Sequence, residues 1–204
     1  MQMKIHFAVC ICLLSLAFIT GCVKNESHYY PDNDFPGTAI FSNTGNNVFS
    51  CYINGQPWRT IDRKVGGLGP PTYEVSINKQ NFDSLTDHFS ISWFGYYLDN
   101  PYGYGNITLI LSVPKNFGLA DFSTLQGQRL SIDGVNNYFL AQVDTVTRMG
   151  SGSIYFNTAE LDSDDVNRVI QGRMSGLLEA NFGSVVLTSG RFDHNLDGIP
   201  VLFN

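Results

Sequence analysis

The feature that most constrains the fold of this chain is a repeated alternation of apolar and polar residues, interrupted by short runs of turn-forming residues. Phe89, Ile91 and Trp93 alternate with polar residues, and the same pattern recurs over 107–113. It is typical of strands with one buried face, because successive side chains point to opposite faces of a sheet. Only 119–125 could form a turn or two of helix. We therefore expect an all-β domain, either an antiparallel β-sandwich or a lipocalin-like barrel.

Turn residues divide this pattern into individual strands. Asn54-Gly55 lies between two apolar runs and predicts a hairpin with a type I′ turn, whose two central residues need positive φ. We expect 130–132 to pair with 138–143, and Gly150-Ser151-Gly152-Ser153 to form a flexible turn. The last strands are expected at 154–161, 166–178 and 184–192.

The N-terminus has the features of an export signal. Lys4 precedes an uncharged apolar run over 7–19, which is too short to span a bilayer as a helix. The segment Ile19-Thr20-Gly21-Cys22 that follows resembles the bacterial lipobox. We therefore expect 1–21 to be a lipoprotein signal peptide. Cys22 would then carry a diacylglycerol thioether and an amide-linked acyl chain such as palmitate, and several chains together give stable anchoring.

Two parts are expected after the signal peptide. Residues 22–37 are polar and contain proline, which predicts a flexible tether between the lipidated cysteine and the all-β domain at 38–204. Once Cys22 is acylated, Cys51 is the one thiol left in the mature chain, so no internal disulfide is possible. The formal net charge of −6 and the lack of a basic cluster argue against nucleic acid as a partner.

Several short motifs resemble a family of uncharacterised β-rich lipoproteins that is common in Bacteroidota. They are the lipobox, the hairpin Ile53-Asn54-Gly55-Gln56-Pro57-Trp58, the run Ile170-Gln171-Gly172-Arg173-Met174 and the closing run Leu187-Thr188-Ser189-Gly190-Arg191-Phe192-Asp193. The resemblance implies a β-rich fold in the cell envelope, at the outer membrane, and no activity. Lys24 and Glu26 match an outer-face export signal only in part, so the periplasmic and the surface-exposed side both stay open.

A calcium site is one hypothesis for the C-terminal segment. Asp193, Asn195 and Asp197 occupy the first three ligand positions of a calcium loop, and Gly198 occupies its sharp turn. The twelfth position, where a bidentate Glu belongs, is Asn204. The alternative is an ordinary Asn/Asp/Gly turn, which composition favours. Apart from this calcium hypothesis, we expect no cofactor.

An aromatic segment at 93–106 is the best candidate for a binding surface. Tyr96, Tyr97, Tyr102 and Tyr104 are interleaved with Gly, Asn and Asp, a composition that suits stacking on sugars and contact with proteins alike. The alternative is a hairpin in which these aromatic side chains cover a sheet edge.

We find no catalytic motif. There is no Gly-x-Ser-x-Gly, no P-loop and no His pair at metal-binding spacing. Cys51 alternates with apolar residues and is read as a buried hydrophobe. The sequence therefore predicts a non-enzymatic binding or structural module, held at the membrane by its lipid, with a glycan or a protein as partner. The alternatives are a carbohydrate-binding accessory lipoprotein of a glycan-uptake system and a lipocalin-like carrier of an apolar ligand.

Overall fold

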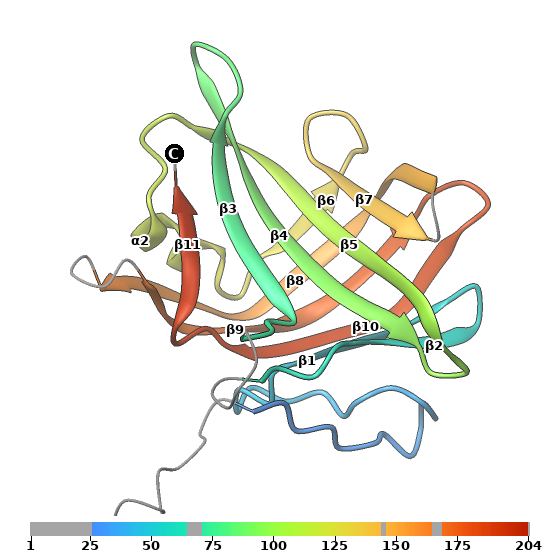
Figure 1. Cartoon of the computed structure of the whole chain (residues 1–204). Helices are drawn as coiled ribbons and strands as arrows, with labels where there is room; N and C mark the ends of the chain where they lie inside the picture. Colours follow the sequence, from blue (N-terminus) through green and yellow to red (C-terminus); the bar gives the residue numbers. More distant parts are fainter. Residues whose placement is uncertain (1–25, 65–70, 144–145, 165–168, 204) are drawn as a thin grey trace, which may run out of the picture.

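The protein folds into a closed β-barrel (Figure 1). The computed structural model describes residues 26–64, 71–143, 146–164 and 169–203. Its elements are β1 (Val48–Ile53), β2 (Gln56–Thr60), β3 (Val75–Asn81), β4 (Thr86–Tyr97), β5 (Asn100–Pro114), α2 (Leu119–Phe122), the 3-10 turn η1 (Ser123–Leu125), β6 (Arg129–Ile132), β7 (Tyr138–Val143), β8 (Val146–Asp164), β9 (Val169–Asn181), β10 (Val186–Asn195) and β11 (Ile199–Phe203).

Eight antiparallel strands close the barrel in the order β1-β10-β9-β8-β7-β5-β4-β2, and β2 pairs back onto β1. The expectation of an all-β fold is confirmed, and of the two architectures it left open the structure has the lipocalin-like barrel. Closure leaves no free edges in the ring, which explains how short strands such as β1 and β2 hold their place without disulfides.

The barrel wall forks where two of its strands change partner. β4 pairs with β3 over Asp87–Trp93 and with β2 over Gly95–Tyr97. On the other side, β9 pairs with β10 over 173–181 and with β11 over 169–170. Because β3 and β11 pair with each other in parallel, they close the wall at one end, while β2, β1 and β10 close it at the other.

Glycines let the long strands β8 and β9 approach each other where they bend. A Cβ atom at Gly152 would overlap the carbonyl oxygen of Glu179, and one at Gly176 would overlap the carbonyl oxygen of Tyr155. Gly150-Ser151-Gly152-Ser153, expected to be a flexible turn, instead lies inside β8. The expectation was wrong because a glycine pair that serves close strand approach looks in sequence like a turn.

Strand pairing differs from expectation in two further places. β6 pairs with β8 and not with β7, which instead lies between β5 and β8. The chain also continues past the last expected strand, because β10 runs to Asn195 and β11 follows it. The hairpin at Asn54-Gly55 is confirmed, with φ of 51° and 81° and direct pairing of Ile53 with Gln56. The short helix expected at 119–125 is confirmed as α2 and η1.

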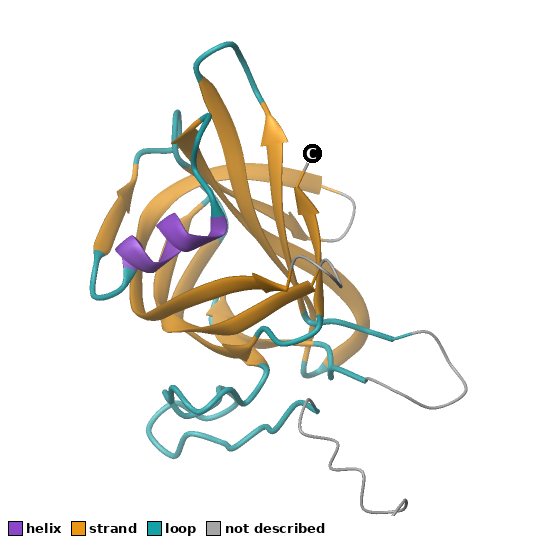
Figure 2. Ribbon diagram, turned by 90° about the vertical axis from the view of Figure 1, so that its left-hand side faces the viewer, coloured by secondary structure: helices purple, strands orange, loops and turns teal. Residues whose placement is uncertain are grey.

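Aromatic rings fill the interior of the barrel. Neighbouring ring centroids lie 5.1–5.8 Å apart along one continuous chain, which runs Trp58, Phe49, Trp93, Phe192, Phe156, Phe122, Phe89 and Phe117. Phe122 belongs to α2, whose position against the barrel is seen in Figure 2. Large rings in edge-to-face and tilted contact make this interior a packed core.

Residues 26–47 form a strap beneath the barrel, drawn in blue at the bottom of Figure 1. Asp32 pairs with Arg191 of β10, and the hydroxyl of Tyr52 in β1 donates to the carbonyl oxygen of Pro36 at 2.7 Å. A flexible tether was expected up to residue 37. In the structure, the carbonyl oxygen of Glu26 accepts a hydrogen bond from the side chain of Asn47, the last residue of the strap. The hydroxyl of Ser27 accepts one from the amide of Arg63, which follows β2.

Truncation of the central ring should destabilise the protein strongly. Phe192 is 1% exposed and contacts the rings of both Trp93 and Phe156, so Phe192→Ala removes two ring contacts and leaves a cavity. We expect a loss of about 3–5 kcal/mol in the free energy of unfolding, measured by urea denaturation. The control Phe82→Ala, at a side chain that is 61% exposed, should cost less than about 1 kcal/mol. Equal losses in the two variants would contradict a packed interior.

Candidate functional site

Four buried polar side chains meet where the barrel wall forks. We call them the fork cluster: Arg63, Glu74, Trp93 and His194. Arg63 follows β2, Glu74 precedes β3, Trp93 lies in β4 and His194 lies in β10, and each is at most 1% exposed. A backbone hydrogen bond brings Trp93 and Glu74 together, because the amide of Phe94 donates to the carbonyl oxygen of Glu74 at 3.0 Å.

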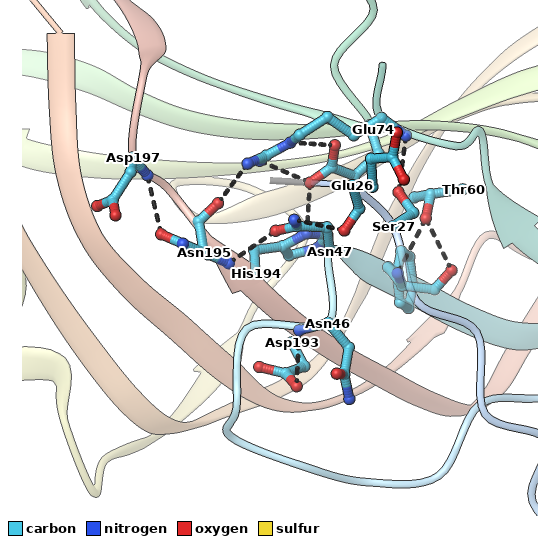
Figure 3. Close-up of polar contacts among 12 residues, drawn as sticks. Glu26, Ser27, Asn46, Asn47, Thr60, Glu74, Asp193, His194, Asn195 and Asp197 are labelled. Carbon is cyan, nitrogen blue, oxygen red and sulfur yellow. Dashed lines mark hydrogen bonds and ion pairs between the residues drawn. The ribbon is translucent and has the colours of Figure 1, made fainter. Parts of the chain in front are cut away.

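A bidentate ion pair between Arg63 and Glu74 lies at the centre of the cluster. Nε and Nη2 of Arg63 donate to the two carboxylate oxygens of Glu74 at 2.9 and 2.7 Å. Nη1 of Arg63 donates to the carbonyl oxygen of Asn195 at 2.7 Å, which ties the β2–β3 connection to the end of β10. Figure 3 shows Glu74 beside His194 and Asn195.

Hydrogen bonds assign a neutral form to His194. The indole Nε1–H of Trp93 donates to Nε2 of His194 at 3.0 Å, so this nitrogen carries no proton. Nδ1 therefore carries the proton and donates to Glu74 at 3.0 Å. Burial by itself would raise the pKa of Glu74, but the hydrogen bond from His194 and the guanidinium of Arg63 outweigh it and hold the pKa below the ordinary value of 4.5.

The chemistry of the fork cluster is structural. A histidine between a carboxylate and a second donor resembles a general-base arrangement, yet the Glu74 and His194 side chains are fully buried and point their polar atoms at each other. The cluster satisfies groups that the fork would otherwise leave unpaired inside the barrel wall. We conclude that it holds β2, β3, β4 and β10 in register.

Beside this cluster, the C-terminal acidic side chains accept hydrogen bonds from backbone amides. The carboxylate of Asp193 accepts hydrogen bonds from the hydroxyl of Ser42 and from the amides of Thr44, Gly45 and Asn46 in the strap, and it is 3% exposed. These contacts give the carboxylate a structural role in holding the strap against β10.

The other two candidate calcium ligands also accept from amides. Oδ1 of Asn195 accepts from the amide of Asp197, and Oδ1 of Asp197 accepts from the amide of Gly172. Among the residues that the structure describes, no three His, Cys, Asp or Glu side chains are grouped as a metal site. The calcium loop stays a hypothesis, and we build no function on it.

The four candidate tyrosines do not share one face. Tyr96 and Tyr104 are cross-strand partners with ring centroids 6.5 Å apart, and the hydroxyl of Tyr96 accepts from Nη2 of Arg59 at 2.9 Å. Tyr97 packs against the core, because consecutive residues of a strand point to opposite faces. Tyr102 lies in β5, and its side chain is outside the described part of the structure.

An open groove lies next to Tyr104 on the outside of the barrel. It encloses approximately 380 Å³ and is lined by Ile61, Phe94, Gly95, Tyr104, Gly105, Asn106 and Gln142. Tyr104 is 64% exposed and Phe94 is 36% exposed. Phe94, Asn106 and Gln142 are in register across β4, β5 and β7, so an aromatic ring and two amide side chains face solvent in one row.

Sequence reasoning found part of this site. It selected 93–106, which contributes Phe94, Tyr104 and Asn106, but not Ile61 or Gln142, which only barrel closure brings beside them. It also missed the pairing of Arg63 with Glu74. These residues flank a Gly/Pro-rich connection, and a charge at each end of such a connection is the one local signal that could have suggested it.

The cysteines differ in what the structure says of them. Cys22 lies outside the described residues. Cys51 is fully buried in β1, and burial raises the pKa of its thiol well above the ordinary value, as expected for a cysteine that acts as a small hydrophobe. In the described part of the chain, no helix has the length and hydropathy to cross a bilayer.

Breaking the ion pair between Arg63 and Glu74 should lower the free energy of unfolding more than removing a charge from an exposed side chain. Glu74→Gln leaves the guanidinium of Arg63 buried without a counter-charge, so we expect a loss of about 3–5 kcal/mol in the free energy of unfolding at pH 7. Because the pKa of Glu74 is lower in the folded state, its contribution is present above pH 4.5 and disappears as pH falls through the folded value. Urea denaturation at pH 7 and pH 3.5 should therefore show a smaller difference between variant and wild type at the acidic pH.

The exposed Glu179 provides the matched control, and Glu179→Gln should change the free energy of unfolding by less than about 0.5 kcal/mol. A Glu74→Gln variant as stable as wild type at pH 7 would contradict the proposed role of the ion pair.

Comparisons with protein-family models, with curated proteins and with solved structures gave no match.

Proposed function

We propose that this protein is a lipid-anchored, non-enzymatic binding module of the bacterial cell envelope, which presents an outer groove on its barrel to a ligand. The anchor is argued from sequence, where Cys22 ends a lipobox after a short apolar run. The module is argued from structure, because a closed barrel is a rigid scaffold on which a binding surface can be carried.

The observation that carries the proposal is the contrast between the interior of the barrel and its outer groove. Inside, Trp58, Trp93 and Phe192 lie in a continuous chain of rings and are at most 1% exposed. Outside, Phe94 and Tyr104 expose their rings beside amide side chains. An apolar carrier needs space within the barrel, whereas a surface receptor needs exposed rings and hydrogen-bonding groups, so the arrangement favours the receptor.

The groove supports a carbohydrate as the first ligand to test. A sugar ring has an apolar face that stacks on an aromatic side chain and hydroxyls that pair with amides. Tyr104 provides the ring, and Asn106 and Gln142 provide the amides. This makes a carbohydrate-binding accessory lipoprotein the second, more specific candidate function. A protein partner would use the same rings.

Lipid attachment is tested at the cysteine itself. In cells labelled with radioactive palmitate, Cys22→Ala should carry no label, because the thioether and the new amino terminus both require this residue. Cys51→Ala is the matched control and should keep the label. Label on the Cys22→Ala protein, or none on wild type, would overturn the anchor.

Sugar binding is tested at the most exposed ring. If wild type binds a glycan on an array, Tyr104→Ala should weaken that binding about tenfold, which corresponds to the loss of one ring contact of ~1.4 kcal/mol. Phe82→Ala removes an exposed ring between β3 and β4 and should leave binding unchanged. A Tyr104→Ala variant with wild-type affinity, or a wild type that binds no glycan, would overturn the carbohydrate candidate.

A further inference from the structure

The strap that lies beneath β1 and β10 carries an unusual number of exposed apolar side chains. Tyr30 is 53% exposed, Phe35 37%, Ile40 41% and Phe41 43%. Exposed apolar residues scattered singly need no explanation, but a group within one short segment marks a surface that meets another apolar phase.

Tyr30 and Ile40 lie on neighbouring stretches of the strap, whereas the ring of Phe35 packs on the guanidinium of Arg191 in β10 at 4.3 Å. The amide of Ile40 donates to the carbonyl oxygen of Tyr30 at 2.9 Å, and Pro31 bridges to Ala39. Tyr29 stacks on the guanidinium of Arg59 in β2 at 4.8 Å, whereas its neighbour Tyr30 is exposed. The same division occurs at the return segment, where Ala39 is buried and Ile40 is exposed.

The strap is fixed to the barrel very near the proposed anchor. The hydroxyl of Ser27 accepts a hydrogen bond from the amide of Arg63 at 2.7 Å. Three residues separate Cys22 from Glu26, and the four Cα-to-Cα steps between them span at most about 14 Å. That reach is less than half the length of the ten-residue strand β10, ~33 Å, so a lipidated barrel stays against the bilayer.

We propose that the outer side of the strap is a membrane-contacting surface, on which Tyr30, Ile40 and Phe41 rest in the interfacial region of the lipid bilayer. The proposal rests on lipidation of Cys22. Tyrosine and phenylalanine are suited to the boundary between headgroups and acyl chains. The charged groups of the strap are exposed Glu26 and Asp34 and the paired Asp32, so contact relies on apolar burial and not on attraction to anionic lipid.

The groove beside Tyr104 lies near the strap. Its lining includes Ile61, which follows β2, together with residues of β4, β5 and β7. Tyr29 of the strap stacks on Arg59 of β2, which donates to the hydroxyl of Tyr96, and the ring centroid of Tyr96 lies 6.5 Å from that of Tyr104. A strap that rests on the bilayer would therefore hold this groove close to the membrane surface.

Tryptophan quenching by brominated phosphatidylcholine tests the contact in the full lipidated protein. Phe41→Trp places a probe on the strap, and Leu85→Trp places one at the β3–β4 turn, where Leu85 is 78% exposed. The native Trp58 and Trp93 are at most 1% exposed and give the same background in both variants. We expect about a twofold loss of the probe fluorescence for Phe41→Trp and none for Leu85→Trp, because only rings at the acyl boundary meet the bromine atoms.

Vesicle flotation, read on the same samples, separates the two possible failures. If the protein floats but Phe41→Trp is not quenched, or both probes are quenched alike, the membrane-contacting strap is overturned and the lipid anchor stands. If the protein does not float, the anchor is overturned and the membrane contact with it. Quenching equal in neutral vesicles and in vesicles with added phosphatidylglycerol would support apolar contact; quenching only with the anionic lipid would overturn it.

Discussion

The buried ion pair between Arg63 and Glu74 is the interaction on which the rest of the structure depends. It lies where β4 changes its pairing partner from β2 to β3, a position at which a simple barrel would leave an opening in its wall. The pair spans this opening, and Arg63 also reaches the end of β10 through the carbonyl oxygen of Asn195. A buried ion pair adds little net stability over an apolar replacement, but loss of either partner is costly, so it specifies the register of the fork.

Both proposed surfaces, the outer groove and the strap, adjoin this fork. The outer groove opens beside Phe94, where β2 ends and Ile61 leaves the sheet. Hydrogen bonds hold the strap in place: the hydroxyl of Ser27 accepts one from the amide of Arg63, and the carboxylate of Asp193 accepts others from residues 42–46. Since packed rings line the interior, we place the proposed binding surface on the outside of the barrel.

Local patterns predicted those parts of the fold whose cause is local. The turn at Asn54-Gly55 depends on two residues that tolerate positive φ, and the buried faces of β4 and β5 depend on alternation within each strand. Where the cause is a distant strand, prediction was wrong. The glycines 150 and 152 serve a close approach to β9, and β6 pairs with a strand about twenty residues further on. His194 lies in the C-terminal segment for which composition favoured an ordinary turn, and it is buried because Trp93 of β4 and Glu74 before β3 bond to its ring.

By itself the sequence determined the all-β class, the hairpin at Asn54-Gly55, the short helix at 119–125 and the buried faces of β4 and β5, because these follow from alternation and turn chemistry. The lipobox at Cys22 stays a prediction from a contiguous motif. It also singled out the aromatic segment that lines the groove. The tertiary structure alone decided that the strands close into a barrel, that Arg63 pairs with Glu74, and that Ile61 and Gln142 lie beside the aromatic segment. The physical reason is that closure, register and buried charge pairing join residues far apart in the chain, and no local pattern encodes which of them will meet.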